Sequence, residues 1–524
     1  MLKKLASVGG WTMVSRVTGF ARDVVMAATM GVGPVTDAFV VALRLPNHFR
    51  AIFGEGAFNA AFVPTYAQAI ASRGTDAARL FAGRIAGLVV ATQILVLVGA
   101  IAFMPGLVGL LAPGFADDPE RFALAVSLTR ITFPYLFFVT LVTLVSGVLN
   151  AHDRFAAAAA APVLLNLSFV AGLGLAFLFP TAGHAAAWAV AVAGVLELAL
   201  VMADAGRARV LPRPALPALD PDVRKFFRTL GPALIGSAGV QIAMFADTII
   251  ASMLPRGAVS ALYFADRLYQ LPVGVIAIAA GTVLLPEMSR RLASGDEAGA
   301  YRAQNDTIAI TLVLALPCAG AFLVVPDLVM LALFGRGAFT AADAAAAGAV
   351  LAAYATALPA VVVIRSALAS FHARSDTTTP LYASLAGVAV NVAFKIVLTG
   401  PFGAPGLALA TAIGAWVNVG LLVVLAQRRG WAAPDGRLVR IVGASVFATA
   451  AMAAGVWLAR EPVAEIAAGL PMLATEASLA ALAILGAILY GGIALGALRV
   501  MGVRLPKPRR RGARGGDDGV GGSG

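Results

Sequence analysis

Long apolar stretches separated by short polar breaks run through almost the whole chain. A helix needs about 20 apolar residues to cross the hydrocarbon core of a bilayer. The stretches reach that length repeatedly, and several contain proline or glycine, which predicts bent or tilted helices. A transmembrane β-barrel is excluded because its strands alternate apolar and polar residues over about ten positions. We predict an all-α polytopic membrane protein with about fourteen transmembrane helices, at residues 6–29, 35–66, 80–111, 123–150, 157–179, 185–204, 230–253, 259–286, 306–334, 344–371, 379–399, 405–426, 439–459 and 474–499.

The composition supports the membrane class and excludes others. Of the 524 residues, 60% are hydrophobic and 13% are charged, whereas an ordinary soluble protein carries about 25% charged residues. A soluble enzyme, a disordered chain and a fibrous repeat are therefore excluded. The single cysteine, Cys318, excludes an internal disulfide framework. Four histidines without a Cys/His cluster predict no metal site, and we expect no cofactor.

The net charge of +12, from 39 Lys+Arg against 27 Asp+Glu, is distributed in a pattern along the chain. Every second loop is basic, and the loops between are nearly free of base except for Arg121, Arg256, Arg336 and Arg460. By the positive-inside rule, the even span count places both termini of this multi-pass membrane protein in the cytoplasm. The charge is mostly a topology signal, so we expect no nucleic-acid partner. The basic segments are residues 3–4, 73–79, 154, 207–228, 290–302, 374, 428–440 and 504–514.

A weak internal repeat relates the two halves of the chain. Pro134 and Asn166 are separated by the same 32 positions as Pro359 and Asn391. Asp23 aligns with Asp247, and the separation between these two aspartates is close to that between Pro134 and Pro359. Six spans lie between paired segments, so the repeat is parallel, an arrangement that places a substrate cavity between two lobes. We predict an N-terminal lobe (1–205), a cytoplasmic linker with an amphipathic helix (206–229), a C-terminal lobe (230–430), an extra helix pair (431–503) and a disordered basic tail (504–524).

Charged residues inside the predicted spans indicate where the chemistry lies. Each arginine or aspartate at a helix centre costs roughly 2.5–3.5 kcal/mol to insert, so such residues normally face a bundle interior or an aqueous cavity. We expect four arginines to bind an anionic group, because arginine keeps its charge and grips phosphate bidentately. These are Arg16, Arg22, Arg50 and Arg267.

The other intramembrane charges have two open interpretations, gating and simple charge pairing. They are Asp23, Asp37, Arg44, Glu55, Asp247, Asp266 and Lys395. In the simpler interpretation the aspartates 23, 37, 247 and 266 only neutralise Arg22, Arg44, Lys395 and Arg267. Arg365 is a further intramembrane cation.

Two long motifs resemble a known family. "SRVTGFARDVVMAATMGVGPVTDAFVVALRLPNHFRAIFGEGAFNAAFVP" (15–64) and "YFADRLYQLPVGVIAIAAGTVLLPEMSR" (263–290) are similar to the two signatures of the MurJ (MviN) lipid II flippases. The resemblance implies the multidrug/oligosaccharidyl-lipid/polysaccharide exporter fold. It also carries the family's functional arginines onto Arg16, Arg22, Arg50 and Arg267, and its acids onto Asp37 and Glu55.

The function that this resemblance implies is transport for peptidoglycan biosynthesis, and not enzymatic catalysis. The undecaprenyl-pyrophosphate-linked precursor would move from the inner to the outer leaflet of the cytoplasmic (inner) membrane by alternating access. The expected partners are lipid II and membrane lipids, and the protein is expected to be a monomer. Some members are thought to hold sodium at acids of the seventh and eleventh helices. Here Lys395 follows Asn391 by one turn, which departs from that pattern. The alternatives are a flippase for another polyprenyl-linked oligosaccharide and a polytopic polyprenyl-phosphate glycosyltransferase.

Overall fold

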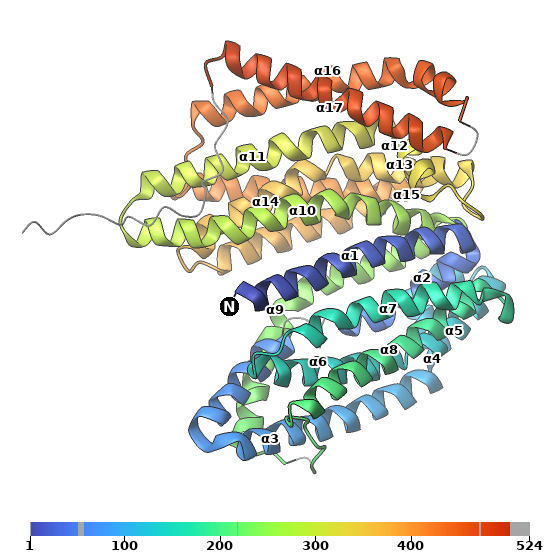
Figure 1. Ribbon diagram of the computed structural model, residues 1–524, viewed down its shortest axis with the longest axis vertical. Coiled ribbons are helices and arrows are strands. Elements are labelled where there is room, and N and C mark those ends of the chain that lie inside the picture. The colour runs from blue at the N-terminus through green and yellow to red at the C-terminus, as the bar shows by residue number, and fades with distance from the viewer. Residues whose placement is uncertain (1, 51–56, 217, 471–472, 504–524) are drawn as a thin grey trace, which may run out of the picture.

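The computed structural model describes residues 2–50, 57–216, 218–470 and 473–503. Throughout these residues the regular structure is helical, and the helices run across the molecule in two groups (Figure 1). Nine helices of the described part are long and apolar enough, by length and composition, to cross a membrane. The prediction of an all-α membrane protein is confirmed, while the count of fourteen spans stays a prediction. Glu55 and the predicted tail at 504–524 lie outside the described residues.

The first group of helices is built from the N-terminal part of the chain. It comprises α1 (Leu2–Met30), α2 (Pro34–Arg50), α3 (Ala57–Ala102), α4 (Met104–Leu111), α5 (Pro119–Thr132), α6 (Tyr135–Ala151), α7 (Ala156–Gly174) and α8 (Ala182–Arg207), with 3₁₀ turns η2 (Pro113–Phe115) and η3 (Ala176–Leu178).

The second group is built from the C-terminal part of the chain. It comprises α9 (Pro221–Ser252), α10 (Ala258–Ala293), α11 (Glu297–Val324), α12 (Pro326–Phe334), α13 (Ala341–Ala355), α14 (Leu358–His372) and α15 (Thr378–Arg428). Two further helices, α16 (Gly436–Ala467) and α17 (Ala474–Val500), pack against each other and against α11 at its outer edge (Figure 1).

The two halves break their helices at corresponding places. The short helices α4 and α12 each follow a long one and each carry a proline in their first turn. The pairs α5–α6 and α13–α14 are interrupted beside Pro134 and Pro359. Proline lacks an N–H group and clashes with the preceding turn, so it interrupts a helix at these points. This shared succession of breaks is what an internal repeat predicts.

Helices α3 and α15 each fold back on themselves at a glycine. Gly74 has φ 84° and Gly403 has φ 58°, values that glycine adopts without steric strain. Across Gly74 the rings of Phe62 and Phe81 stack with centroids 5.5 Å apart. Each element therefore supplies two antiparallel arms.

The segment predicted to form an amphipathic helix in the linker is the beginning of a longer helix. α9 runs without interruption from Pro221 to Ser252. Asp220 caps this helix by accepting a hydrogen bond from the Val223 amide at 2.7 Å. The first turns of α9 pack on the N-terminal half, where Val223 and Phe226 are buried against α3. One rigid element thus connects the halves.

The loops alternate between two ends of the bundle. The arginine-rich loops lie at one end, where Arg154 pairs with Asp204 and Arg429 with Asp376; we call this the basic end. At the opposite end the Ala338 amide donates to the Ala28 carbonyl at 2.7 Å. The four isolated arginines of the base-poor loops all pair with acids, in Arg121–Asp37, Arg256–Asp118, Arg336–Glu476 and Arg460–Asp327.

Candidate functional site

Arg22 is held in a fixed orientation by side chains of α1 and α7. Its guanidinium donates to Asp23 Oδ1 from Nε at 3.0 Å and from Nη2 at 2.8 Å, and Nη1 donates to Asn166 Oδ1 at 3.1 Å. Asn166 in turn donates from Nδ2 to Thr18 Oγ1 and to the Ser15 carbonyl. Gly19 lies against this amide, since a Cβ there would be in van der Waals contact with Asn166 Nδ2 at 3.5 Å. The arginine is therefore preorganised.

Asp23 joins the two halves of the molecule. It is 4% exposed, and its Oδ1 accepts a hydrogen bond from the Tyr263 hydroxyl of α10 at 3.0 Å. Arg267 Nε lies 3.8 Å from Asp23 Oδ2, and the Arg267 guanidinium lies 4.7 Å from the centroid of the Tyr263 ring. One buried carboxylate thus brings Arg22 of α1 and Arg267 of α10 together, consistent with the predicted cavity between halves.

A cavity of about 440 Å³ lies between α1 and α10 and is lined by arginines. Arg16, Arg22 and Arg267 line it, and so does Arg365 of α14; we call it the arginine cavity. Gly274 makes space for the first of them, because a Cβ at that position would lie 2.7 Å from Arg16 Nη1. The structure brings together three of the four predicted arginines and adds Arg365, whose only sequence signal is its place inside a predicted span.

The fourth predicted arginine, Arg50, lines a neighbouring cavity of about 560 Å³, here called the central cavity. Arg267 lines both cavities. Arg44 also lies here and donates to Thr248 Oγ1 at 2.6 Å, which joins α2 to α9. The cavity walls carry further charged groups from the C-terminal half of the chain, namely Asp247, Asp266 and Lys395.

The carboxylates of the central cavity have different partners. Lys395 pairs with Asp247, as the simpler interpretation of the sequence predicts. Asp266 instead accepts a hydrogen bond from Gln270 Nε2 at 2.7 Å. The predicted pairing of Asp266 with Arg267 is not among the ion pairs of the described residues.

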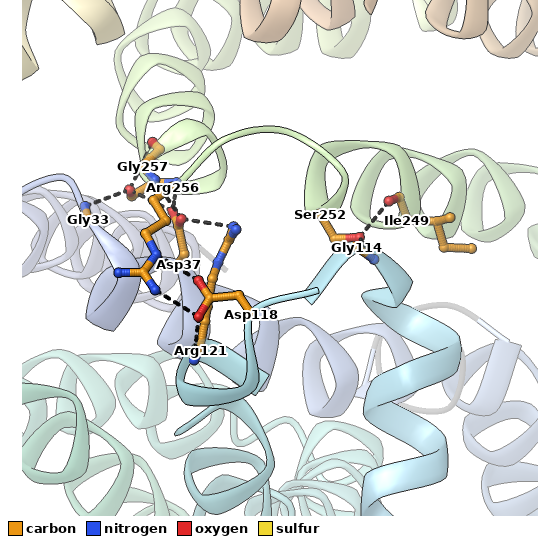
Figure 2. Close-up of polar contacts among 10 residues, drawn as sticks. Gly33, Asp37, Gly114, Asp118, Arg121, Ile249, Ser252, Arg256 and Gly257 are labelled. Atoms are coloured by element: carbon orange, nitrogen blue, oxygen red, sulfur yellow. Dashed lines mark hydrogen bonds and ion pairs between the residues drawn. The ribbon is translucent and has the colours of Figure 1, made fainter. Parts of the chain in front are cut away.

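At the opposite end of the bundle, the buried side chain of Asp37 connects the two halves of the molecule (Figure 2). This residue of α2 is fully buried and its side chain contacts the N-terminus of α10. There the carboxylate accepts hydrogen bonds from the amides of Gly257 at 2.7 Å and Ser260 at 2.8 Å. The Ser260 hydroxyl donates to Oδ1 at 2.8 Å. A helix N-terminus leaves amide groups without intrahelical partners and attracts negative charge. An acid of the N-terminal half thus caps a helix of the C-terminal half.

Arg121 supplies the countercharge for Asp37. Its Nη2 lies 2.9 Å from Asp37 Oδ2, and its guanidinium carbon lies 3.7 Å from the centroid of the Phe115 ring. Asp37 therefore lies beside Arg121 and not beside Arg44, the partner in the simpler interpretation of the sequence, since Arg44 bonds to Thr248. Arg121 belongs to a loop-proximal turn of α5, and the sequence signals it only as an exception to the charge bias.

A second, exposed layer covers the buried one (Figure 2). Arg256 forms a bidentate pair with Asp118, with distances of 2.7 and 2.8 Å. Beside it the Gly114 amide donates to Ser252 Oγ at 3.2 Å. These contacts again connect the two halves. We call the buried and exposed layers together the latch, defined by Asp37, Arg121, Ser260, Asp118 and Arg256.

Comparison with known families agrees with this geometry. The sequence model of the family described as "Lipid II flippase MurJ" matches residues 26–472. The chain is 39% identical over 521 residues to a probable lipid II flippase MurJ of Rhizobium meliloti, covering 98% of this chain and 97% of the relative. It is 34% identical over 458 residues to the lipid II flippase MurJ of Burkholderia cenocepacia, covering 85% and 88%.

Solved structures show the same fold. An inward closed lipid II flippase MurJ superimposes with a TM-score of 0.78 at 22% identity, covering 94% of this chain and 99% of that one. An inward-facing multidrug transporter of the MATE family superimposes with a TM-score of 0.66 at 14% identity, covering 79% and 94%. The predicted exporter fold is confirmed.

Proposed function

The chain belongs to the MurJ family of lipid II flippases, and from this premise we propose that it moves lipid II across the cytoplasmic membrane by alternating access. The arginine cavity between α1 and α10 is the observation that carries the proposal. It concentrates positive charge at the seam between halves, with Asp23 as the acid among its lining residues. Such a site suits the pyrophosphate of a lipid whose tail remains in the bilayer.

Three arginines of the arginine cavity, Arg16, Arg22 and Arg267, contact the pyrophosphate together. Arg22 is locked by Asp23 and Asn166, and it offers a preorganised donor edge. Arg16 is exposed and free to close on an arriving anion, whereas Arg267 is held beside Asp23 and the Tyr263 ring with 37% of its side chain exposed. Guanidinium groups bind phosphate oxygens in pairs and stay charged at any physiological pH. Arg50 in the central cavity contacts the head group further along its path.

The latch supports the gating part of the proposal. It joins both halves at the end that the loop charges assign to the outside. The basic end faces the cytoplasm, where the lipid enters. To release the head group outside, the halves rotate, and Asp37 separates from the α10 N-terminus while it keeps Arg121 within its own half. No bond of the substrate is made or broken in this cycle.

Substitution of the two arginines that meet at Asp23 tests the site. We expect Arg22→Ala or Arg267→Ala to abolish translocation of lipid II while the protein still inserts, because each removes a fixed cation from the arginine cavity. The measurement is growth of a depletion strain that carries the variant as sole copy, with protein levels checked by immunoblot. Arg302→Ala, at an exposed pair outside the site, is the matched control. Wild-type growth with both site variants would overturn the assignment.

Binding to the purified protein tests the substrate. We expect lipid II to bind more tightly than undecaprenyl pyrophosphate alone, because the central cavity adds contacts to the head group. Equal affinity for other polyprenyl-linked glycans would favour a different cargo.

A further inference from the structure

A buried ion pair lies in the C-terminal half, apart from the arginine cavity. The Lys395 side chain on α15 is 1% exposed and pairs with the carboxylate of Asp247 on α9, whose side chain is 40% exposed. Both residues line the central cavity. Asp247 thus faces the cavity, whereas the ammonium lies behind it. Lys395 is poorly placed to contact a substrate directly.

The internal repeat shows what is unusual about this pair. Asp23 and Asp247 correspond in the two halves, as do Asn166 and Asn391. In the N-terminal half the cation beside the aspartate is Arg22, on the same helix and lining the arginine cavity. The position that corresponds to Lys395 there is Val170, four residues after Asn166. The C-terminal half therefore neutralises its aspartate with a lysine that is absent from the other half.

A sodium ion at this place, which the family resemblance implies for some members, does not fit the residues present. Sodium prefers oxygen ligands, as other hard cations do. Asp247 and Thr411 could supply oxygens in the central cavity, but the ammonium of Lys395 already neutralises the carboxylate. A second cation beside the ammonium would be repelled, and Arg44, which lines the same cavity, adds a further positive charge.

We propose that the Lys395 ammonium is a covalently attached substitute for a monovalent metal ion at Asp247. The side chain keeps the pocket charge-balanced throughout the cycle, so this protein binds no sodium there. Removal of the ammonium without loss of the carboxylate creates a sodium site formed by Asp247 and the neighbouring cavity oxygens. The inference goes beyond the proposed function, because it concerns the cation of the C-terminal half and not the lipid.

Thermal unfolding of the purified full-length protein in NaCl or in choline chloride at equal ionic strength tests the proposal without any transport assay. Wild type should melt at the same temperature in both salts. Lys395→Met leaves Asp247 unpaired, and its melting temperature should rise by several degrees with NaCl in a saturable manner, because sodium binds only the folded state. Lys395→Met/Asp247→Asn, which has neither charge, should again be insensitive to the cation.

The outcomes separate the proposal from a purely structural role. Recovery of folded Lys395→Met in NaCl but not in choline chloride also supports it. A saturable sodium effect in wild type that Asp247→Asn abolishes would overturn it, since metal and lysine would then coexist. Folded Lys395→Met that ignores sodium would overturn it as well. So would a Lys395→Met variant that folds in neither salt while the double variant folds, because no small ion would then replace the ammonium.

Discussion

Burial distinguishes the two arginines that connect the halves at the latch. The Arg121 side chain is 3% exposed and its partner Asp37 is fully buried, whereas the Arg256 side chain is 55% exposed. Removing one partner of a buried pair leaves a charge without compensation in a medium of low polarity. An exposed pair loses little, since water replaces the partner. Arginine therefore contributes very differently to the stability of the protein at these two sites of the latch.

The first prediction at this scale concerns Arg121. Arg121→Met should lower the free energy of unfolding by on the order of 3 kcal/mol, because Asp37 stays buried without its cation. Asp37→Asn/Arg121→Met should recover much of this loss. The measurement is a double-mutant cycle of unfolding in a mixed-micelle denaturant titration. Arg256→Met is the matched control and should have a far smaller effect; equal effects of the two substitutions would contradict the burial argument.

The second prediction concerns pH at the basic end. Asp376 accepts hydrogen bonds from the amides of Thr378 and Thr379 at 3.0 Å and pairs with Arg429. The Thr379 amide, with Arg429 as a smaller contribution, lowers the pKa of Asp376 to about 2.

An unfolded aspartate has a pKa of about 3.9, so the stabilisation by Asp376 is present above pH 4 and is lost as the pH falls toward 2. Between pH 5 and 2.5 the melting temperature of Asp376→Asn should vary less than that of wild type. An identical pH profile for the two proteins would argue against the contribution.

Glycines determine how closely elements approach one another. The amide of Ala215 in the linker donates to the Gly83 carbonyl of α3 at 2.9 Å, so the linker lies directly on this helix. A Cβ at Gly83 or Gly87 would overlap linker carbonyl oxygens. Their spacing of four residues places both on one face of α3. The linker can thus pack directly on α3 because these two positions have no side chain. Helix α9 then continues from the linker into the second half.

Gly87→Val tests this docking. The added side chain meets the Ala215 carbonyl and should destabilise the protein by about 1–3 kcal/mol, as overpacking does. Release of the linker should also accelerate trypsin cleavage after Arg209, which is exposed. Gly99→Val on the same helix, where nothing lies within 4 Å, controls for helix propensity. Unchanged proteolysis of the Gly87 variant would show that the linker is held elsewhere.

At the scale of the whole molecule, three polar contacts between halves bear on the transport cycle. The latch closes the opposite end, the bonds of Asp23 join α1 to α10 beside the arginine cavity, and Arg44 joins α2 to α9 in the central cavity. The largest apolar cluster also contains residues of both halves, such as Phe39 and Phe264. A rocking motion of two such halves requires that the latch open while each half stays intact.

A reversible cross-link tests that motion. In a Cys318→Ser background, which removes the native cysteine, Asp118→Cys/Arg256→Cys treated with a short, reducible bis-thiol reagent should stop translocation in proteoliposomes. Reduction should restore it. The uncross-linked double variant is the internal control, since it lacks the exposed pair but can still move. Full translocation by the cross-linked protein would exclude opening at this end.

The sequence alone determined the membrane class, the all-helical fold and the residues most expensive to insert, and it predicted the individual spans and the internal repeat. These follow from local properties, because hydrophobic length and buried charge are readable position by position. It also signalled the arginines that line the cavities, since a cation in a span needs a polar surrounding. The breaks at Pro134 and Pro359 were visible in the same way.

Only the tertiary structure decided which charges meet. Asp37 pairs with Arg121 and the α10 N-terminus, Asp23 with Tyr263 and Arg267, and Arg365 joins the arginine cavity. Helical periodicity indicates which face a residue occupies, but the partner depends on which distant helix packs there. Which helices become neighbours depends on two features of the tertiary structure. Helices α3 and α15 each fold back at a single glycine, and the linker continues into α9.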